Sequence, residues 1–247
     1  MSEMLRIYGL FGGFPKYYAT IKQFSLQNKN YAEVIKYLFV QENAPLETEV
    51  IDILKQEFGR RSSLYYALIH AITTGKTKLS EIANTVQMKE SSITRHLGEL
   101  EEKFNLIVAL RPIDNKKNTR YYLKHPLLAF WFAFVYDKFS KYTLRETDQF
   151  MGDIVKAFNT FFGRRFEEIC KEWIIFLNTE NKLPIKLDYL SKWWGYKRIN
   201  NGREEIEIAL IGTASPNKIM FIECKWKDNV SAEQVLKQLK NKTNYID

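Results

Sequence analysis

The sequence predicts an α+β protein in which helical segments and a helix-turn-helix with a two-stranded hairpin come first and an α/β domain follows. Three observations lead to this prediction. Apolar residues recur every three or four positions in several segments, which is the helical period. Two short helices around residues 80–100 are followed by two short strand-like runs. Two apolar runs near the C-terminus have the composition of buried strands.

Composition is that of an ordinary soluble globular protein with two or three domains. The chain has 247 residues, of which 45% are hydrophobic and 27% charged. The longest apolar stretch, residues 126–136, is too short to span a bilayer, and the N-terminus lacks a signal-peptide pattern. Two cysteines, Cys170 and Cys224, make neither a disulfide framework nor a zinc site. We therefore expect a cytoplasmic protein without membrane contact.

The net charge of +8 is unevenly distributed. Residues 1–62 contribute +1, residues 63–150 contribute +4 and residues 151–247 contribute +3. A basic surplus over the last two segments fits a polyanionic partner, and DNA is the partner we expect.

Residues 1–62 are predicted to be helical. Helical stretches over residues 31–39 and 47–58 follow the segment Leu10-Phe11-Gly12-Gly13-Phe14-Pro15.

Residues 63–125 predict a winged helix-turn-helix. An apolar helix over residues 64–73 is followed by a short helix over 80–86, a tight turn and a helix over 91–100 whose apolar residues share one face. Strands over residues 106–110 and 120–123 then flank a polar tip at 114–118. This order of elements is that of a recognition helix followed by a wing.

The predicted recognition helix and wing carry polar and basic side chains that supply donors for phosphates and base edges. The predicted nucleic-acid contacts are Lys89, Ser91, Ser92, Thr94 and Arg95 on the helix and Lys116, Lys117 and Arg120 on the wing. The alternative is a protein-docking module on which these charges are only solvated. His96 has no second metal-ligand residue at a suitable spacing and is read as a solvated helix residue.

One motif in this region resembles the end of a phosphate-binding loop. Thr73-Thr74-Gly75-Lys76-Thr77 lacks the glycine that such a loop needs at His70, and it follows a helix where a strand is required. We expect a turn here and no bound nucleotide.

Residues 126–150 are predicted to be a helical connector. Phe130, Trp131, Phe132 and Phe134 are read as packing residues, not as base-stacking platforms. A helix over residues 154–177 follows, with its apolar positions three or four apart. Glu167 lies within it.

The two predicted C-terminal strands carry acidic and basic residues. Residues 204–212 and 218–226 are joined by a turn at 213–217, which brings Glu207 close to Glu223 and Lys225. Alternation puts Glu223 and Lys225 on one face. Buried charges of this kind cost several kcal/mol unless they are paired or bind something. Carboxylates that hold Mg²⁺ or Mn²⁺ beside a lysine suit phosphodiester cleavage, so the predicted catalytic residues are Glu207, Glu223 and Lys225. The alternative is a solvated strand edge.

A helix capped by Ser231 is predicted near the C-terminus, with Val235, Leu236 and Leu239 facing inward. Gln234 and Lys237 lie on its polar side and are predicted to reach a phosphate. Upstream, adjacent strand residues Trp193 and Trp194 face opposite sides, so one should be core and the other exposed.

The arrangement of residues 151–247 resembles the PD-(D/E)XK nuclease family. Glu207 stands in the acidic position, where Asp is usual, and Glu223-Cys224-Lys225 matches the (D/E)XK triplet. The resemblance implies a restriction-endonuclease-like α/β domain and makes Glu167 a third metal ligand beside Glu207 and Glu223. It also implies a further strand beyond Asp247, so we expect an incomplete domain.

Four motifs extend the resemblance over nearly the whole chain. They are Gly12-Gly13-Phe14-Pro15, Phe130-Trp131-Phe132, Trp193-Trp194-Gly195 and Glu223-Cys224-Lys225-Trp226. Together they resemble the C-terminal portion of archaeal AAA-type ATPases that end in the domain of unknown function DUF234. This resemblance implies a lid remnant, a winged helix and a nuclease-like domain. The P-loop domain is absent, so the chain is not expected to hydrolyse ATP alone.

Two functions from different classes follow from these patterns. The first is a DNA-binding protein with a metal-dependent phosphodiesterase site. The second is a non-catalytic adaptor that binds DNA or protein, or a regulatory piece that docks on a separately encoded ATPase subunit.

Overall fold

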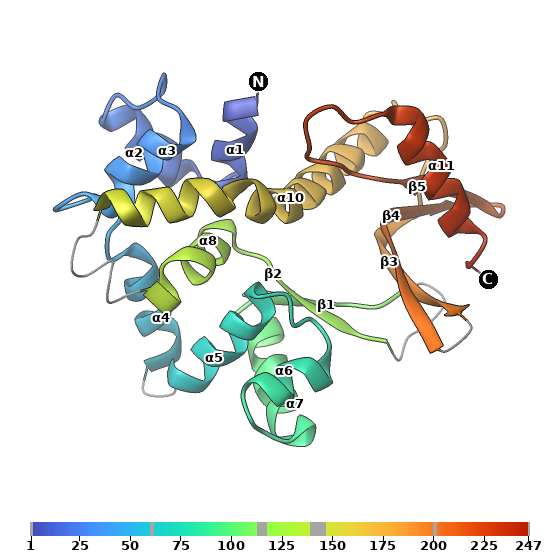
Figure 1. The fold of residues 1–247 in the computed structure, drawn as a ribbon, viewed down its shortest axis with the longest axis horizontal. Helices are drawn as coiled ribbons and strands as arrows, with labels where there is room; N and C mark the ends of the chain where they lie inside the picture. The colour runs from blue at the N-terminus through green and yellow to red at the C-terminus, as the bar shows by residue number, and fades with distance from the viewer. Residues whose placement is uncertain (1, 60–61, 113–117, 139–146, 200–201, 247) are drawn as a thin grey trace. The chain divides into compact units, whose positions relative to one another are not determined.

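The computed structural model describes every residue except 1, 60–61, 113–117, 139–146, 200–201 and 247. The described chain combines helices with two separate antiparallel sheets, one of two strands and one of three, as Figure 1 shows. The predicted α+β class is thereby confirmed. No helix in the described ranges is long and apolar enough to cross a membrane.

The contacts divide the chain into two compact units. The first consists of Met1–Ala109 and Tyr121–Phe162, and the second of Leu110–Arg120 and Gly163–Asp247. The described ends of the segment Leu110–Arg120 therefore belong to the second unit. The predicted division at residues 62, 125 and 150 stays a prediction.

Helices make up most of the first unit. Those before the helix-turn-helix region are α1 (Ser2–Phe11), α2 (Pro15–Gln23), α3 (Tyr31–Ile35), the π-helix η1 (Lys36–Val40) and α4 (Glu49–Phe58). Asn30 caps α3 by accepting a hydrogen bond from the Glu33 backbone N–H at 3.0 Å. Proline at the first position starts α2, because a proline lacks the N–H that would be unpaired there.

The middle of the chain forms the predicted sequence of helices and strands. Its elements are α5 (Ser62–Thr73), α6 (Leu79–Thr85), α7 (Glu90–Gly98), the π-helix η3 (Glu99–Lys103), β1 (Ile107–Leu110) and β2 (Arg120–Leu123). Ile82, Ile93 and Leu97 are fully buried. Apolar residues at the helical spacing therefore hold α6 and α7 against the rest of the first unit.

Helix α8 (Pro126–Phe134) forms the centre of the first core. All of its residues except Ala133 are buried, including Phe130, Trp131 and Phe132. The prediction that these aromatic residues pack is confirmed. A 3₁₀-helix, η4 (Tyr136–Lys138), follows α8.

Helix α10 (Thr147–Thr179) contributes residues to both units. Its apolar positions in the first unit are buried, as at Phe158 and Phe162. Further along, Trp173 is 57% exposed and Phe176 is also exposed, stacked on Trp173 with ring centroids 5.3 Å apart. The apolar positions at this end of the predicted helix are therefore not covered by the described residues.

The second unit is built around a three-stranded antiparallel sheet in the order β3–β4–β5. Its elements are β3 (Tyr189–Ile199), β4 (Gly202–Ala214), β5 (Lys218–Ile222) and the helix α11 (Ala232–Thr243). Strand β4 pairs with β3 along its length, with a bulge between Ser191 and Trp193, but it pairs with β5 only from Leu210 to Ala214. The predicted second strand is thus shorter than expected, because the chain leaves the sheet after Ile222.

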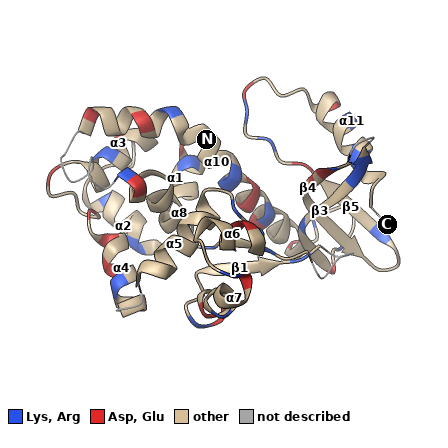
Figure 2. Cartoon of the chain, turned by 60° about the horizontal axis from the view of Figure 1, so that its bottom comes forward, with Lys and Arg blue, Asp and Glu red and all other residues tan. Residues whose placement is uncertain are grey.

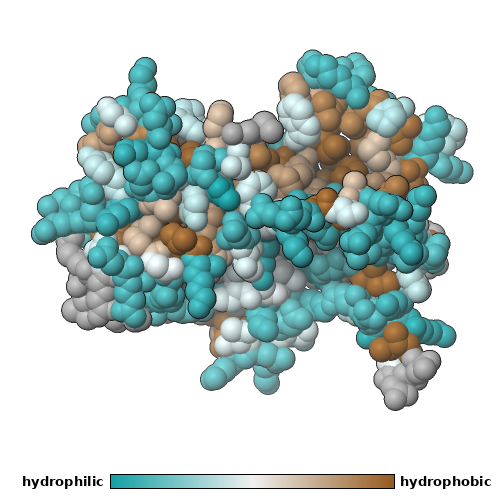
Figure 3. All heavy atoms as spheres, turned by 45° about the horizontal axis from the view of Figure 1, so that its top comes forward, coloured by the Kyte–Doolittle hydropathy of each residue, from teal (hydrophilic) through white to brown (hydrophobic). Residues whose placement is uncertain are grey.

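Apolar residues lie on both faces of this sheet. One cluster joins Trp193, Ile206, Ile208 and Ile211 to Leu239 of α11. The other joins Ala209, Leu210 and Cys224 to side chains that include Phe166 and Cys170 of α10. Leu236 of α11 is 52% exposed, so the expectation that it faces inward was wrong. Figure 3 shows apolar surface within this unit, to which such side chains contribute.

Candidate functional site

Glu223 lies one residue beyond the end of β5 and is held by two lysines. Its side chain is 8% exposed and accepts hydrogen bonds from Lys225 Nζ at 2.7 Å and Lys242 Nζ at 2.9 Å. The structure therefore brings Glu223 and Lys225 together, as the alternation of the strand predicted. Sequence reasoning missed Lys242, which comes from α11.

Glu207 has a different partner. Its side chain is 63% exposed and forms an ion pair with Arg120, which also pairs with Glu205. Arg120 is only 4% exposed, and its guanidinium carbon lies 4.7 Å from the centroid of the Trp194 ring. Two carboxylates and an aromatic face thus compensate the burial of this cation.

This arrangement corrects two expectations. Arg120 is buried within the second unit, so it does not offer its guanidinium to DNA from the wing. Trp193 and Trp194 are both 2% exposed, whereas one of them was expected to face solvent. Trp194 is covered because Arg120 lies over its ring and because its indole N–H donates to the Asn118 carbonyl at 3.2 Å.

Glu207 and Glu223 lie beside different clusters. Ile206 and Ile208 pack with Leu239, whereas Glu207 between them pairs with Arg120. Glu223, in contrast, lies against Lys242 of α11, on the face where Leu239 packs.

Glu167 on α10 is neutralised by a third cation. Lys192 of β3, whose side chain is 12% exposed, contacts Glu167 at 2.8 Å and Glu168 at 3.0 Å. Burial raises the pKa of Glu168, but attraction to Lys192, the hydrogen bond from Lys192 and the nearby Arg165 and Lys171 outweigh it, so that pKa lies below its ordinary value. A lysine inside an apolar strand requires a carboxylate partner, and this signal could have identified the contact from sequence.

The three predicted metal ligands do not form a fitting set for Mg²⁺ or Mn²⁺. Each carboxylate is engaged by lysine or arginine, and a divalent ion would have to displace those cations. In the described residues no group of three or more histidine, cysteine or acidic side chains is placed to hold a metal ion. The metal site and its catalytic residues stay predictions.

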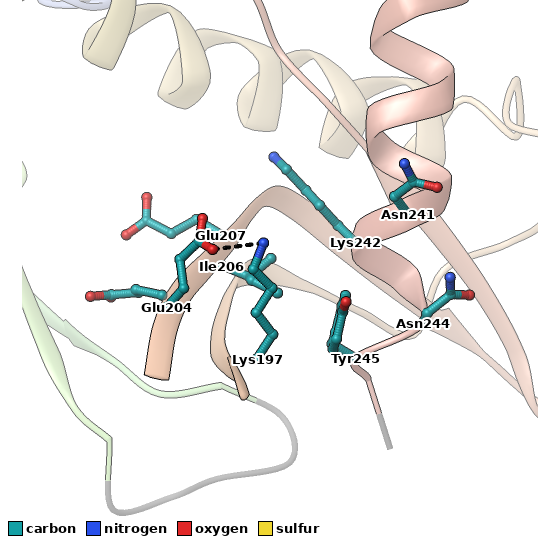
Figure 4. A pocket seen from close by; sticks show the side chains of 9 residues that line it. Lys197, Glu204, Ile206, Glu207, Asn241, Lys242, Asn244 and Tyr245 are labelled. Atoms are coloured by element: carbon teal, nitrogen blue, oxygen red, sulfur yellow. Dashed lines mark ion pairs between the residues drawn. The ribbon is translucent and has the colours of Figure 1, made fainter. Parts of the chain in front are cut away.

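An open cavity of about 750 Å³ lies between the end of the sheet and the last turn of α11 (Figure 4). Glu207 and Lys242 both line it, beside an ion pair in which Lys197 Nζ contacts Glu204 at 2.7 Å. The hydrogen bond to Glu204 raises the pKa of Lys197. The other lining residues are Glu205, Ile206, Asn241, Asn244 and Tyr245.

Helix α7 presents a second candidate site, in the first unit. The predicted contacts Lys89, Ser91, Ser92, Thr94 and Arg95 are all exposed, as is the acidic Glu90 in the first turn. Ile93 and Leu97 occupy the inward positions. The Thr94 hydroxyl donates to the Glu90 carbonyl at 2.8 Å, while Lys89 stands at the N-cap. Figure 2 shows the charged residues of this region along the ribbon.

Arg95 is oriented by a residue that sequence reasoning did not identify. Its Nε donates to Glu99 Oε1 at 3.0 Å, and the Arg95 side chain is 78% exposed. The Tyr65 hydroxyl also donates to Glu99. That hydrogen bond, with those from Arg95, lowers the pKa of Glu99 despite the opposing effect of burial. Glu99 therefore stays ionised beside Arg95.

The remaining predicted contacts are distributed over several places. Lys116 and Lys117 lie outside the described residues. Gln234 and Lys237 are exposed on α11, whose N-terminus is capped by the Ser231 hydroxyl oxygen, which accepts from the Gln234 N–H at 3.3 Å.

Comparisons with known proteins agree with part of the resemblance. Residues 131–238 match the family model DUF234, described as archaea bacterial proteins of unknown function. The uncharacterized protein MJECL04 of Methanocaldococcus jannaschii is 30% identical over 232 residues, which are 92% of this chain and 48% of that protein. The chain thus spans about half the length of the relative. The DUF234 part of the resemblance is supported, and the ATPase context stays a prediction.

Two solved structures are similar at a low level. A NadR structure in complex with 4-hydroxyphenylacetate covers 54% of this chain and 84% of its own, with 19% identity and a TM-score of 0.27. A ZitR variant from Lactococcus lactis covers 57% of this chain and 99% of its own, with 12% identity and a TM-score of 0.27. Similarities of this size carry no argument about function.

Proposed function

We propose that this chain binds duplex DNA through α6 and α7, which with the β1–β2 hairpin act as a winged helix-turn-helix. The proposal rests mainly on one observation. All five predicted contacts are exposed, and they place small hydroxyls and long cations on the outward side of α7, beside the exposed carboxylate Glu90.

The chemistry of this face suits a nucleic acid. Ser91 and Ser92 lie in the first turn of α7, where backbone N–H groups also point outward and favour a phosphate. Lys89 and Arg95 add positive charge at the beginning and middle of the helix. The ion pair with Glu99 restrains Arg95, so less side-chain entropy is lost when it contacts a phosphate or guanine.

For the second unit we propose a non-catalytic adaptor function. The observation that favours it is the pairing of Glu207 with Arg120, of Glu223 with Lys225 and Lys242, and of Glu167 with Lys192. Carboxylates that compensate buried cations stabilise the fold, and they are not free to bind a metal ion. A separately encoded ATPase subunit is the partner we propose for it, from the resemblance to the ATPase family.

Fluorescence anisotropy with a labelled duplex tests DNA binding. We expect affinity to fall steeply between 50 and 200 mM salt, because each neutralised phosphate releases counterions. The double variant Lys89→Ala with Arg95→Ala should weaken binding for all sequences and lower the salt slope by about two, roughly one per lost phosphate contact.

A matched control separates this site from net charge. Lys22→Ala with Lys55→Ala removes the same charge from exposed positions on α2 and α4. We expect this control to bind like the parent. If both double variants lose the same affinity for the duplex, the attraction is nonspecific and comes from the charge of the whole chain. If the α7 variant binds the duplex as tightly as the parent, the alternative that α7 is a protein-docking surface is favoured.

A further inference from the structure

The two cysteines of the chain meet in the core of the second unit. Cys170 lies on α10 and Cys224 directly follows Glu223 beyond β5. We propose that they are a modification site at which a peroxide oxidant joins them in a reversible intramolecular disulfide. This inference is independent of the proposed DNA binding.

The packing brings the two side chains into contact. Cys224 belongs to the cluster with Ala209 and Leu210, and Cys170 packs against that cluster. Phe166, one turn before Cys170, contacts Trp226, two residues after Cys224, with ring centroids 5.1 Å apart. Two pairs of side chains therefore hold the same two segments together and place both cysteines in one cluster.

The two sulfurs differ in exposure, which assigns their order of reaction. Cys224 is buried, whereas Cys170 is only partly buried and can be reached from solvent. Cys170 is therefore the thiol that attacks the oxidant, and Cys224 is the resolving thiol.

The chemistry balances with one peroxide. The Cys170 thiolate attacks one peroxide oxygen, the O–O bond breaks and a hydroxide leaves, which gives a sulfenic acid at Cys170. The Cys224 sulfur then attacks the Cys170 sulfur, the S–O bond breaks and a second hydroxide leaves. The two thiol protons end in the two waters formed. Two thiols are thus oxidised, one peroxide is reduced, and a small thiol reverses the bond by exchange.

The disulfide would connect α10 to the segment that follows β5, and both carry acidic residues of the predicted metal site. Glu223 and Lys225 flank Cys224, and Glu167 lies one turn before Cys170 on α10. Oxidation would therefore fix the segment after β5 covalently to α10, which in the reduced form it contacts through the packing of Cys224 and Trp226.

Peptide mapping of the full chain after treatment with hydrogen peroxide tests the proposal. Remaining thiols are blocked with an alkylating reagent in denaturant, and the digest is measured by mass spectrometry without reduction. We expect a peptide that contains Cys170 linked to the peptide that contains Cys224, in a monomeric protein, and loss of both free thiols. Dithiothreitol should restore both thiols. Over-oxidation of Cys170 without a link, or links only between two copies, would overturn the proposal.

Two further measurements keep the result interpretable. In Cys224→Ser, dimedone should trap the sulfenic acid at Cys170, because the resolving thiol is absent; no adduct there would contradict the assigned order. In the untreated parent, dibromobimane, which becomes fluorescent when it bridges neighbouring thiols, should crosslink Cys170 to Cys224 without any substitution. Failure of this bridge would show that the two sulfurs are not adjacent and would also overturn the proposal.

Discussion

At the scale of residues, two buried cations organise the second unit. Arg120 is enclosed by Glu205, Glu207 and the Trp194 ring, and Lys192 lies between two glutamates of α10. A buried charge is tolerated only when partners replace the water it has lost. The acidic residues that look from sequence like metal ligands therefore serve, in this structure, as counterions of lysine and arginine.

Arg120→Met should destabilise the second unit by about 2 kcal/mol. Removal of one partner of a fully buried pair costs roughly 3–5 kcal/mol, but Glu207 is mostly exposed and water screens it, so the cost should be smaller. Urea unfolding followed by tryptophan fluorescence measures the change, because Trp193 and Trp194 lie in this unit.

Arg111→Met is the matched control for Arg120. Arg111 is exposed and donates to the Thr119 hydroxyl at 3.1 Å, so its loss should change the free energy of unfolding by less than about 0.5 kcal/mol. If both variants unfold like the parent, Arg120 is not compensating for burial as described.

Glu168→Gln should remove part of the pH dependence of stability. The pKa of Glu168 lies below its ordinary value of 4.5, so the ionised carboxylate stabilises the folded state above that pH. This contribution is lost as the pH falls through the lowered folded-state pKa. We expect the variant to be less stable than the parent by roughly 1–2 kcal/mol at pH 7 and equally stable below the folded-state pKa.

Urea midpoints between pH 7 and pH 3 measure this difference. Glu233→Gln, at an exposed position in the first turn of α11, is the control and should follow the parent. A difference between Glu168→Gln and the parent that stays constant with pH would assign the effect to packing and not to ionisation.

At the scale of elements, helices were predicted from sequence more successfully than strand ends and partly exposed faces. Helices α6 and α7 follow from apolar spacing, because Ile82, Ile93 and Leu97 all point to one core. The end of β5 could not be predicted in this way, because the whole of residues 218–226 has the pattern of a strand. The structure shows that the pairing with β4 ends at Leu210 and Ile222. Burial of Trp194 depends on Arg120, far away in sequence, which no local pattern reveals.

Ser231→Ala should shorten or fray the first turn of α11. The serine oxygen accepts a hydrogen bond from the Gln234 N–H, and loss of such a cap costs about 1 kcal/mol. Ser231→Asp keeps an acceptor at the same position and should restore the stability. Hydrogen exchange of the amides in the first turn of α11 measures the effect, and unchanged protection in Ser231→Ala would show that the cap contributes nothing.

At the scale of the whole molecule, the sequence predicted two candidate sites: a DNA-binding face on α7 and a metal site in the second unit. The two predictions depend on different kinds of information. The five residues predicted to contact DNA from α7 are all exposed, as expected. Their exposure depends only on the spacing of residues along one helix. The metal site depended on three distant carboxylates meeting, which requires knowledge of which faces of the sheet they share. Glu207 and Glu223 instead lie beside different clusters, each with its own cations.

Calorimetric titration of the full chain with Mn²⁺ tests this conclusion. A metal ion would have to separate Arg120 from Glu207 and two lysines from Glu223, and this would remove partners from the buried Arg120 and Glu223. We therefore expect no binding of Mn²⁺ that depends on Glu223: parent, Glu223→Gln and the control Glu233→Gln should give the same weak heats. Stoichiometric binding that is lost in Glu223→Gln but retained in Lys225→Ala would contradict this expectation, because a ligand carboxylate is needed to hold the ion whereas the lysine only orients water. That pattern would restore the metal-dependent phosphodiesterase hypothesis in place of the adaptor.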